Sequence, residues 1–107
     1  MLNKQTTLYL YRGASSSIDF DFTGFDFSGG KCIFTISNLC KKENLLQFEF
    51  NQSKKYTMII TDEFTSTLKD NKYLYNIMYV IGGERYPQCS DSDIIVRNVV
   101  NAYGNNN

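Results

Sequence analysis

Hydrophobic residues alternate with polar residues along most of the chain. In the stretch SIDFDF, Ile18, Phe20 and Phe22 occupy every second position, and Asp19 and Asp21 lie between them. A period of two places alternate side chains on one face of a strand, whereas the spacing of three and four that a helix needs occurs in few segments. The sequence therefore predicts an all-β fold, and we expect these aspartates to face water.

The same alternation predicts about seven or eight short strands. They are TTLYLY (6–11), SIDFDF (17–22), KCIFTIS (31–37), LLQFEF (45–50), YTMIIT (56–61), YLYNIMYV (73–80), RYPQCS (85–90) and DIIVRNVV (93–100). Turn signals separate them at intervals of roughly 8 to 12 residues, a pattern typical of an immunoglobulin-like β-sandwich of antiparallel strands. A small barrel is the alternative fold.

Residues in the connections refine this pattern. The segment ASSS (14–17) is expected to be a loop, and Phe25 and Phe27 in TGFDFSGG predict a loop that folds back over the core. The pair Gly82-Gly83 predicts a hairpin. Because Pro87 cannot donate a ladder hydrogen bond, we expect the segment around it at a sheet edge or a bulge.

The segment TDEFTSTLKDNKY contains a helical signal. Thr61 or Asp62 can cap the amides of a single helical turn. Phe64 and Leu68 are four residues apart, so both would lie on the same side of that turn. We therefore expect these two side chains to close one end of the core.

A tyrosine follows this turn directly. Asp70 and Asn71 tolerate the left-handed conformation, which predicts a sharp exit into the strand that begins at Tyr73. In immunoglobulin-like sandwiches a tyrosine just after such a corner sends its hydroxyl back to an upstream backbone group. Tyr73 is therefore predicted to form a structural tyrosine corner; packing with its hydroxyl in water is the alternative. Two marks of antibody domains are absent, since the chain has no tryptophan and this strand has no cysteine.

The strand after the corner is apolar on both faces. If Tyr73, Tyr75, Ile77 and Tyr79 fill the core, then Leu74, Met78 and Val80 form an apolar stripe on the opposite face, interrupted by Asn76. Three interpretations remain open. Both faces of this strand are covered within the chain, a partner chain covers one face, or Asn76 alone makes the face of the apolar stripe polar enough to contact water.

Length and charge narrow the class of protein. The 107 residues fit one domain, assigned to residues 1–100, followed by a polar tail at 101–107 that we expect to fray. Eleven basic residues balance eleven acidic ones, so charge does not predict a nucleic-acid or membrane partner. No segment reads as a signal peptide or a membrane helix.

The cysteines predict free thiols. Cys32, Cys40 and Cys89 are an odd number, at spacings that match no zinc or redox motif. Cys32 and Cys89 fall in alternating apolar segments and are expected to be buried, whereas Cys40 beside two lysines is expected to be exposed.

Little in the sequence predicts catalysis or a cofactor. There is no histidine, and the carboxylate pairs lie on polar faces or in turns rather than in an apolar pocket. Asp62 and Glu63 could join Asp91 and Asp93 to gather oxygen ligands for calcium, but ordinary loop carboxylates are the favoured reading and no metal is predicted. Because phosphate-binding glycine loops are also missing, we expect a protein that is not an enzyme.

Exposed tyrosines are the remaining candidates for binding. Tyr9, Tyr11 and Tyr86 fall on strands near the termini and edges. Such side chains can stack on sugars or anchor a protein interface. A flat row of all three would favour a glycan site, whereas an apolar stripe or edge strand that meets another chain would favour assembly.

Two long stretches resemble a known family. LYLYRGASSSIDFDFTGFDFSGGKCIFTI and TDEFTSTLKDNKYLYNIMYVIGGERYPQCSDSDIIV are similar to the two halves of small immunoglobulin-like domains of bacteriophage virion proteins, notably the N-terminal domain of baseplate upper proteins. The resemblance spans Leu8 to Val100. The chain departs from the family pattern at Ala14, Asn71 and Asn76, where an acidic residue, a glycine and an aspartate are common.

The resemblance implies a non-enzymatic part of a virion, assembled in the host cytoplasm. Such domains dock symmetrically onto tail, baseplate or fibre components, which implies other phage virion proteins and further copies of the chain as partners. Capsid decoration or a head-fibre role is an alternative position in the particle. A carbohydrate-binding module that contacts host surface glycans is the alternative from a different functional class.

Overall fold

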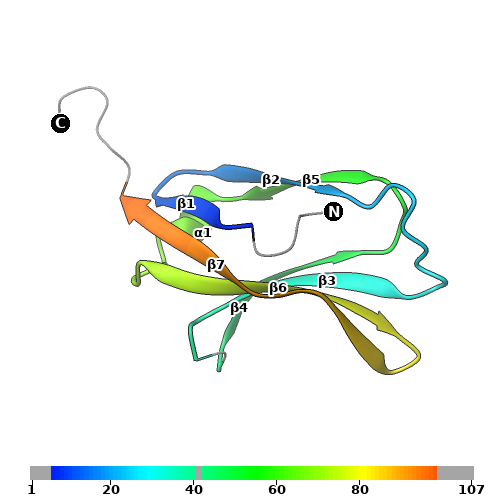
Figure 1. Ribbon diagram of the computed structural model, residues 1–107. Helices are drawn as coiled ribbons and strands as arrows, with labels where there is room; N and C mark the ends of the chain where they lie inside the picture. Colours follow the sequence, from blue (N-terminus) through cyan, green and yellow to red (C-terminus); the bar gives the residue numbers. More distant parts are fainter. Residues whose placement is uncertain (1–5, 41, 99–107) are drawn as a thin grey trace.

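The computed structural model describes residues 6–40 and 42–98, and these residues form a β-sandwich (Figure 1). The strands are β1 (Leu8–Arg12), β2 (Ser16–Asp21), β3 (Lys31–Ser37), β4 (Asn44–Phe50), β5 (Lys55–Ile60), β6 (Lys72–Ile81) and β7 (Glu84–Asn98). One helical turn, α1 (Asp62–Thr65), lies between β5 and β6. The prediction of an all-β sandwich is confirmed.

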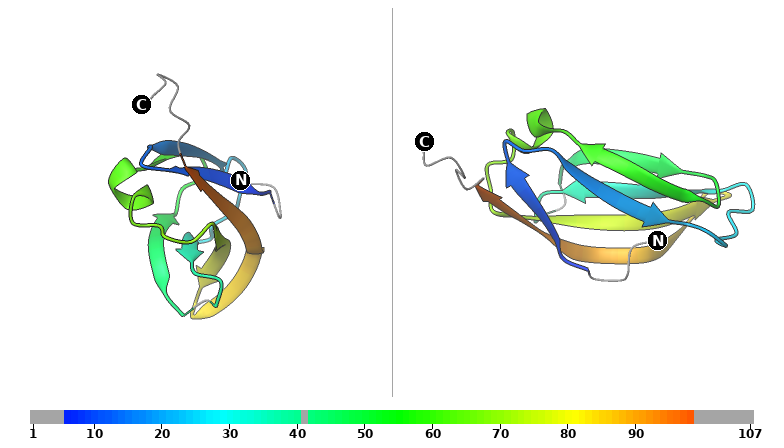
Figure 2. Two further views of the ribbon diagram at one scale, coloured as in Figure 1. Left: turned by 90° about the vertical axis from the view of Figure 1, so that its left-hand side faces the viewer. Right: turned by 90° about the horizontal axis from the view of Figure 1, so that it is seen from above.

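The strands form two sheets that face each other (Figure 2). The larger sheet has the order β1-β7-β6-β3-β4, and the smaller one pairs β2 with β5. The adjacent strands β7, β6 and β3 correspond to the G, F and C strands of an immunoglobulin sheet. One pairing differs from the antiparallel expectation, because β1 runs parallel to β7. These strands lie near opposite ends of the chain, so no short hairpin forces them to be antiparallel.

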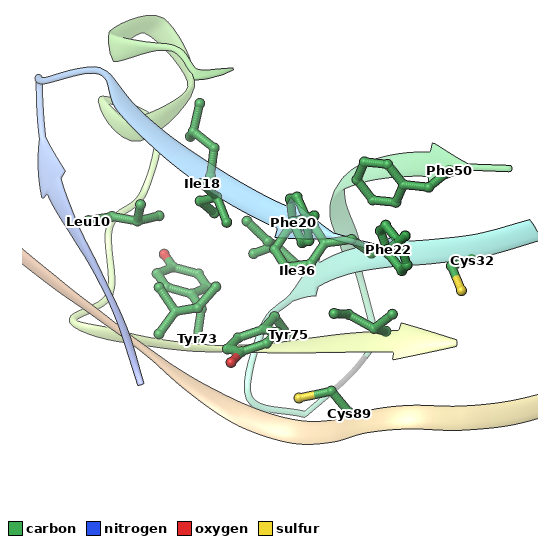
Figure 3. Close-up of a cluster of buried hydrophobic side chains, with 14 of the residues drawn as sticks. Leu10, Ile18, Phe20, Phe22, Cys32, Ile36, Phe50, Tyr73, Tyr75 and Cys89 are labelled. Atoms are coloured by element: carbon green, nitrogen blue, oxygen red, sulfur yellow. The ribbon is translucent and has the colours of Figure 1, made fainter. Parts of the chain in front are cut away.

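Phenylalanine rings fill the space between the sheets (Figure 3). Phe20 of β2 and Phe22, which directly follows this strand, contact Phe50 of β4 with ring centroids 4.7 and 5.1 Å apart. Phe34 of β3 meets Phe20 edge-on at 5.2 Å. Aromatic pairs at these separations add to the free energy of burial itself. Ile18, Phe20 and Phe22 are buried and Asp19 and Asp21 face solvent, as the alternation predicts.

The predicted loop over the core is also present. Phe27 is buried and Phe25 is half-buried, and their rings pack 4.7 Å apart. The hydroxyl of Tyr79 donates a hydrogen bond to the carbonyl of Phe27, which fastens this loop to β6. The loop therefore closes the end of the sandwich opposite the helical turn.

Two strand boundaries differ from the sequence prediction. β2 begins at Ser16, so half of the expected ASSS loop is strand that pairs with β5. The two strands expected at 85–90 and 93–100 form one strand, β7. Asp91, which lies between them, adopts a left-handed conformation (φ 47°) beside an irregularity in the pairing of β6 with β7. A bulge bends a strand without ending it. Pro87 lies at this irregular stretch, as predicted, while residues 99, 100 and the expected tail at 101–107 lie outside the described residues.

Gly30 is required by close packing of backbone rather than by its conformation. A Cβ atom at this position would lie 2.5 Å from the carbonyl oxygen of Val80 on β6. We therefore expect Gly30→Ala to lower the free energy of unfolding by about 1 to 3 kcal/mol, because β3 or β6 would have to shift. Urea denaturation measures this change.

The neighbouring Gly29 is the matched control for this prediction. It has a φ of 86° and open space where a Cβ would lie, and asparagine tolerates that conformation. Gly29→Asn should cost no more than about 1 kcal/mol. Equal losses for the two variants would contradict the packing explanation.

Candidate functional site: a protein-interaction surface

The corner between α1 and β6 positions the predicted tyrosine. Thr61 caps the turn, since its hydroxyl oxygen accepts a hydrogen bond from the amide of Phe64 at 3.2 Å. Leu68 is buried and Phe64 is half-buried, so both pack against the core as expected. Tyr73 is 4% exposed, and its hydroxyl accepts a hydrogen bond from the Asp70 amide at 2.9 Å. The hydroxyl thus satisfies a backbone group of the corner three residues upstream.

The predicted left-handed conformation at Asp70 and Asn71 is wrong. Among the described non-glycine residues only Ser28 and Asp91 have positive φ. The corner is shaped instead by Arg12 of β1, whose Nε donates to the Leu68 carbonyl at 2.6 Å and whose Nη2 donates to the Asp70 carbonyl at 3.0 Å. The planar guanidinium fork binds both carbonyls at once, so the chain can turn without left-handed backbone.

Sequence reasoning did not identify Arg12 or Thr65 as structural residues. Thr65 is fully buried; its hydroxyl donates to the carbonyl of Ala14 at 3.0 Å and accepts from the Gly13 amide at 3.1 Å. Together these two side chains tie the β1–β2 turn to the corner. Their partners lie more than fifty positions away in the chain, so no local pattern signals the contacts.

The outer face, meaning the face of the five-stranded sheet turned away from β2 and β5, is a candidate interaction surface. No described helix or strand covers it (Figure 2). The outer apolar stripe, Leu74, Met78 and Val80 of β6, lies there half-buried. The reading in which the chain covers both faces of β6 is therefore wrong for the described residues.

Asn76 interrupts this stripe and belongs to the β6–β7 irregularity. Its side-chain oxygen accepts a hydrogen bond from the Asp91 amide at 2.9 Å. Asn76 thus stabilises the bulge of β7 in addition to placing an amide on the outer face. A shallow groove of about 280 Å³ runs beside it; its lining includes Ile33, Met78 and Arg85, and the buried Ser37, whose hydroxyl makes no hydrogen bond with the described residues.

Ion pairs border the stripe on two sides. Lys31 of β3 meets Glu49 of β4 at 3.3 Å, and Lys72 of β6 meets Asp93 of β7 at 3.5 Å. All four side chains are well exposed, so each pair contributes little to stability. The outer face therefore combines an apolar centre with balanced charge at its border, an arrangement common in protein interfaces.

The three candidate tyrosines do not form one row. Tyr9 and Tyr11 lie exposed on β1 beside Ile95 and Arg97 of β7, on the outer face. Tyr86 lies opposite Tyr79 at the far end of the β6–β7 hairpin, on the side of the sheet that faces the core. The guanidinium of Arg97 also lies 5.1 Å from the centre of the Tyr9 ring and occupies one face of it.

The candidate carboxylates remain apart. Asp62 and Glu63 begin α1, whereas Asp91 and Asp93 belong to β7, and no group of three or more potential metal ligands occurs among the described residues. The three cysteines are free thiols, with Cys32 and Cys89 buried and Cys40 exposed, as predicted. In the described part of the chain no helix could span a membrane.

Two buried side chains should make the protein less stable at alkaline pH. Burial raises the pKa of the Cys32 thiol from 9.0 to about 11 and that of the Tyr75 hydroxyl, which donates to the Thr6 carbonyl, from 10.0 to about 12. At neutral pH both groups are uncharged whether the chain is folded or unfolded. As pH rises from 9 to 12, the unfolded chain ionises first, so the free energy of unfolding should fall.

Urea denaturation across this range, with Cys32→Ala as the comparison, tests this prediction. The variant lacks the thiol, so its loss of stability between pH 9 and 11 should be smaller than that of the natural chain. Identical slopes in this window would show that the Cys32 thiol does not contribute.

Substitution of Tyr73 or of Arg12 should lower the free energy of unfolding by different amounts, because each side chain makes its own hydrogen bonds at the corner. Tyr73→Phe leaves the Asp70 amide without its acceptor and should lower the free energy of unfolding by about 1 kcal/mol. Arg12→Lys replaces a fork with a single ammonium and should cost about 2 kcal/mol.

Arg97→Lys is the matched control, because this arginine only stacks over the exposed Tyr9 and should change stability by less than about 1 kcal/mol. Urea denaturation of the three variants measures how much each lowers the free energy of unfolding. An Arg12→Lys variant as stable as Arg97→Lys would contradict the assigned role of the fork.

Comparison of the sequence with models of known protein families gives no match, and comparison with curated proteins gives none either. The resemblance to bacteriophage virion domains therefore rests on the residue patterns of the sequence.

Proposed function

We propose that this protein is a non-enzymatic structural or adaptor protein of a bacteriophage particle. It acts by packing its β-sandwich against other virion proteins, and against further copies of itself, where a tail, baseplate or fibre is attached. The particle, assembled in the host cytoplasm, is its site of action. The virion assignment comes from the sequence resemblance, and binding as the activity comes from the surfaces of the sandwich.

The observation that carries the binding function is the uncovered outer face. Leu74, Met78 and Val80 expose part of their side chains there, although the opposite face of the same strand is closely packed. A polar outer face would be sufficient for a sandwich that remains alone in solution. Exposed apolar side chains with a charged border support contact with another protein.

The placement of the carboxylates is in keeping with binding rather than catalysis. General acid and base chemistry needs a carboxyl group held in an apolar pocket with a raised pKa. Asp19, Asp21, Asp62 and Glu63 are all exposed. None of these side chains offers that environment.

Capsid decoration is the alternative within the same class, and the two positions differ in copy number. A decoration protein occupies a repeated site on the capsid, whereas a tail or baseplate component is present in few copies. Quantitative mass spectrometry of purified particles separates these outcomes. Absence of the chain from the particles would overturn the virion assignment altogether.

The glycan-binding alternative receives less support from the geometry. Sugar-binding surfaces use aromatic rings that lie side by side and present open faces. Tyr86 lies far from Tyr9 and Tyr11, and Arg97 already covers one face of Tyr9. We expect no binding above background on an array of host surface glycans.

A charge in the outer apolar stripe should prevent incorporation into particles. Met78→Glu places a carboxylate at the centre of the stripe, and burying it against a partner would cost several kcal/mol. When supplied in place of the natural chain during assembly, this variant should be depleted from purified particles as measured by mass spectrometry.

Thr57→Glu is the control, since Thr57 is exposed on the smaller sheet and faces away from the core. This variant should be incorporated at the level of the natural chain. Thermal unfolding of both variants establishes that each is folded. Normal incorporation of a folded Met78→Glu chain would show that the stripe is not the contact surface.

A further inference from the structure

We propose that β4 pairs edge to edge with the β4 strand of a second copy of this chain, antiparallel and centred on Phe48. This inference deepens the proposed function and rests on it only in taking contact between protein chains as the activity. It assigns the contact to one edge and one register.

The first observation is that β4 is a free edge of the larger sheet. Among the described residues it pairs only with β3, so its other side carries backbone groups that no strand satisfies (Figure 1). Such an edge is a template for another extended chain. The pairing with β3 is regular from Leu46 to Phe50, so this part of the strand can accept a further partner.

The second observation concerns protection of the other edges. On β7 the segment not covered by β1 contains Pro87, which lacks an N–H group, and the left-handed Asp91. β5 is preceded and begun by two lysines at 54 and 55, and β2 presents Asp19 and Asp21. Proline, bulges and charges are the usual devices that prevent edge pairing.

β4 lacks these devices. Its segment Leu46–Phe50 has no proline and no lysine, and Glu49, which is its one charged residue, already pairs with Lys31 of β3 at 3.3 Å. The other edge of the larger sheet, β1, has five residues, ends at the charged Arg12 and already buries its inward Leu10. Of the described edges, β4 is therefore the one suited to a partner strand.

The third observation is that apolar side chains at this edge are incompletely buried. Leu46 and Phe48 point into the core and are only half-buried, whereas Phe34 and Ile36, their partners on β3, are fully buried. A further strand on the free side of β4 would cover them.

The strand is complementary to itself in one register. Antiparallel pairing centred on Phe48 places this ring opposite its copy and Leu46 opposite Phe50, so apolar residues meet on the inner side. On the outer side Gln47 lies opposite Glu49, and an amide can donate to a carboxylate there. No like charges face each other, and all five residues of the regular segment are paired. This complementarity identifies the partner as a second copy.

Substitutions at Gln47 test the register by the sign of their effect. Gln47→Glu sets two carboxylates opposite each other, twice by symmetry, and should weaken the dimer; Gln47→Lys forms two ion pairs and should strengthen it. Each change should alter the dissociation constant by roughly threefold or more, because two cross-strand pairs change at once. Sedimentation equilibrium of the full chain at concentrations up to about 1 mM detects even a millimolar constant.

The matched controls are Thr57→Glu and Thr57→Lys on the edge strand β5, which should leave the dissociation constant unchanged. Gln47 and Thr57 are both exposed on outward faces, where Gln47 donates one hydrogen bond to Thr35 and Thr57 donates one to Asp19. The four variants lose only this surface contact and should remain folded, as thermal unfolding verifies. High salt should reduce the difference between the two Gln47 variants.

A natural chain that stays monomeric throughout this range would overturn the proposal. So would a dimer that is indifferent to both Gln47 substitutions, since another surface would then join the copies. These outcomes leave the particle experiment untouched. A dimer with the expected charge dependence, formed by a chain that is absent from particles, would instead refute only the virion assignment.

Discussion

The whole architecture depends on a layer of aromatic rings held between two sheets. Alternate positions of β2, β3 and β4 place phenylalanines in this layer, and each ring loses most of its contact with water there. Burial of large apolar side chains is the dominant favourable contribution to folding, and ring-to-ring contacts add to it. The outward positions are thereby left to polar residues, and the sandwich has little freedom in register, because a slip of one residue would expose the layer.

The two ends of this layer are closed in different ways. At one end the loop with Phe25 and Phe27 folds over the rings, and Tyr79 holds it through a hydrogen bond to the Phe27 carbonyl. At the other end Leu68 is buried, and hydrogen bonds of Arg12 and Tyr73 hold the backbone that follows the helical turn. Closing the ends with hydrogen-bonded backbone allows a sandwich of this size to exclude water from its rings without a disulfide.

The sequence was sufficient to predict the parts of this fold that local patterns determine. The period of two located the strands, although it divided β7 into two, and it identified the inward residues of β2 and β6; the Thr61 cap and the glycine hairpin follow from short-range chemistry. The Arg12 fork was not predictable, because its carbonyl partners lie 56 and 58 positions away. The prediction of left-handed backbone at Asp70 and Asn71 was wrong for the same reason. The distant guanidinium of Arg12 binds the carbonyls of the corner, so the turn needs no left-handed residue. The continuity of β7 was hidden as well, since a bulge at Asp91 and a strand end have similar polar sequences.

The candidate site was less accessible to sequence than the fold. The stripe of Leu74, Met78 and Val80 follows from alternation, but whether something covers it depends on the whole topology. The same holds for the edge of β4, because a strand is an edge only by virtue of its neighbours. The two surfaces are connected in space: pairing of two β4 strands would join the two larger sheets into one continuous sheet, and the outer faces of both copies would become one surface. A dimer would thereby double the apolar and charged area offered to a third partner, and binding through both copies at once would raise the effective affinity without any new contact. Edge pairing and face binding would then act in sequence, with the first building the surface that the second uses.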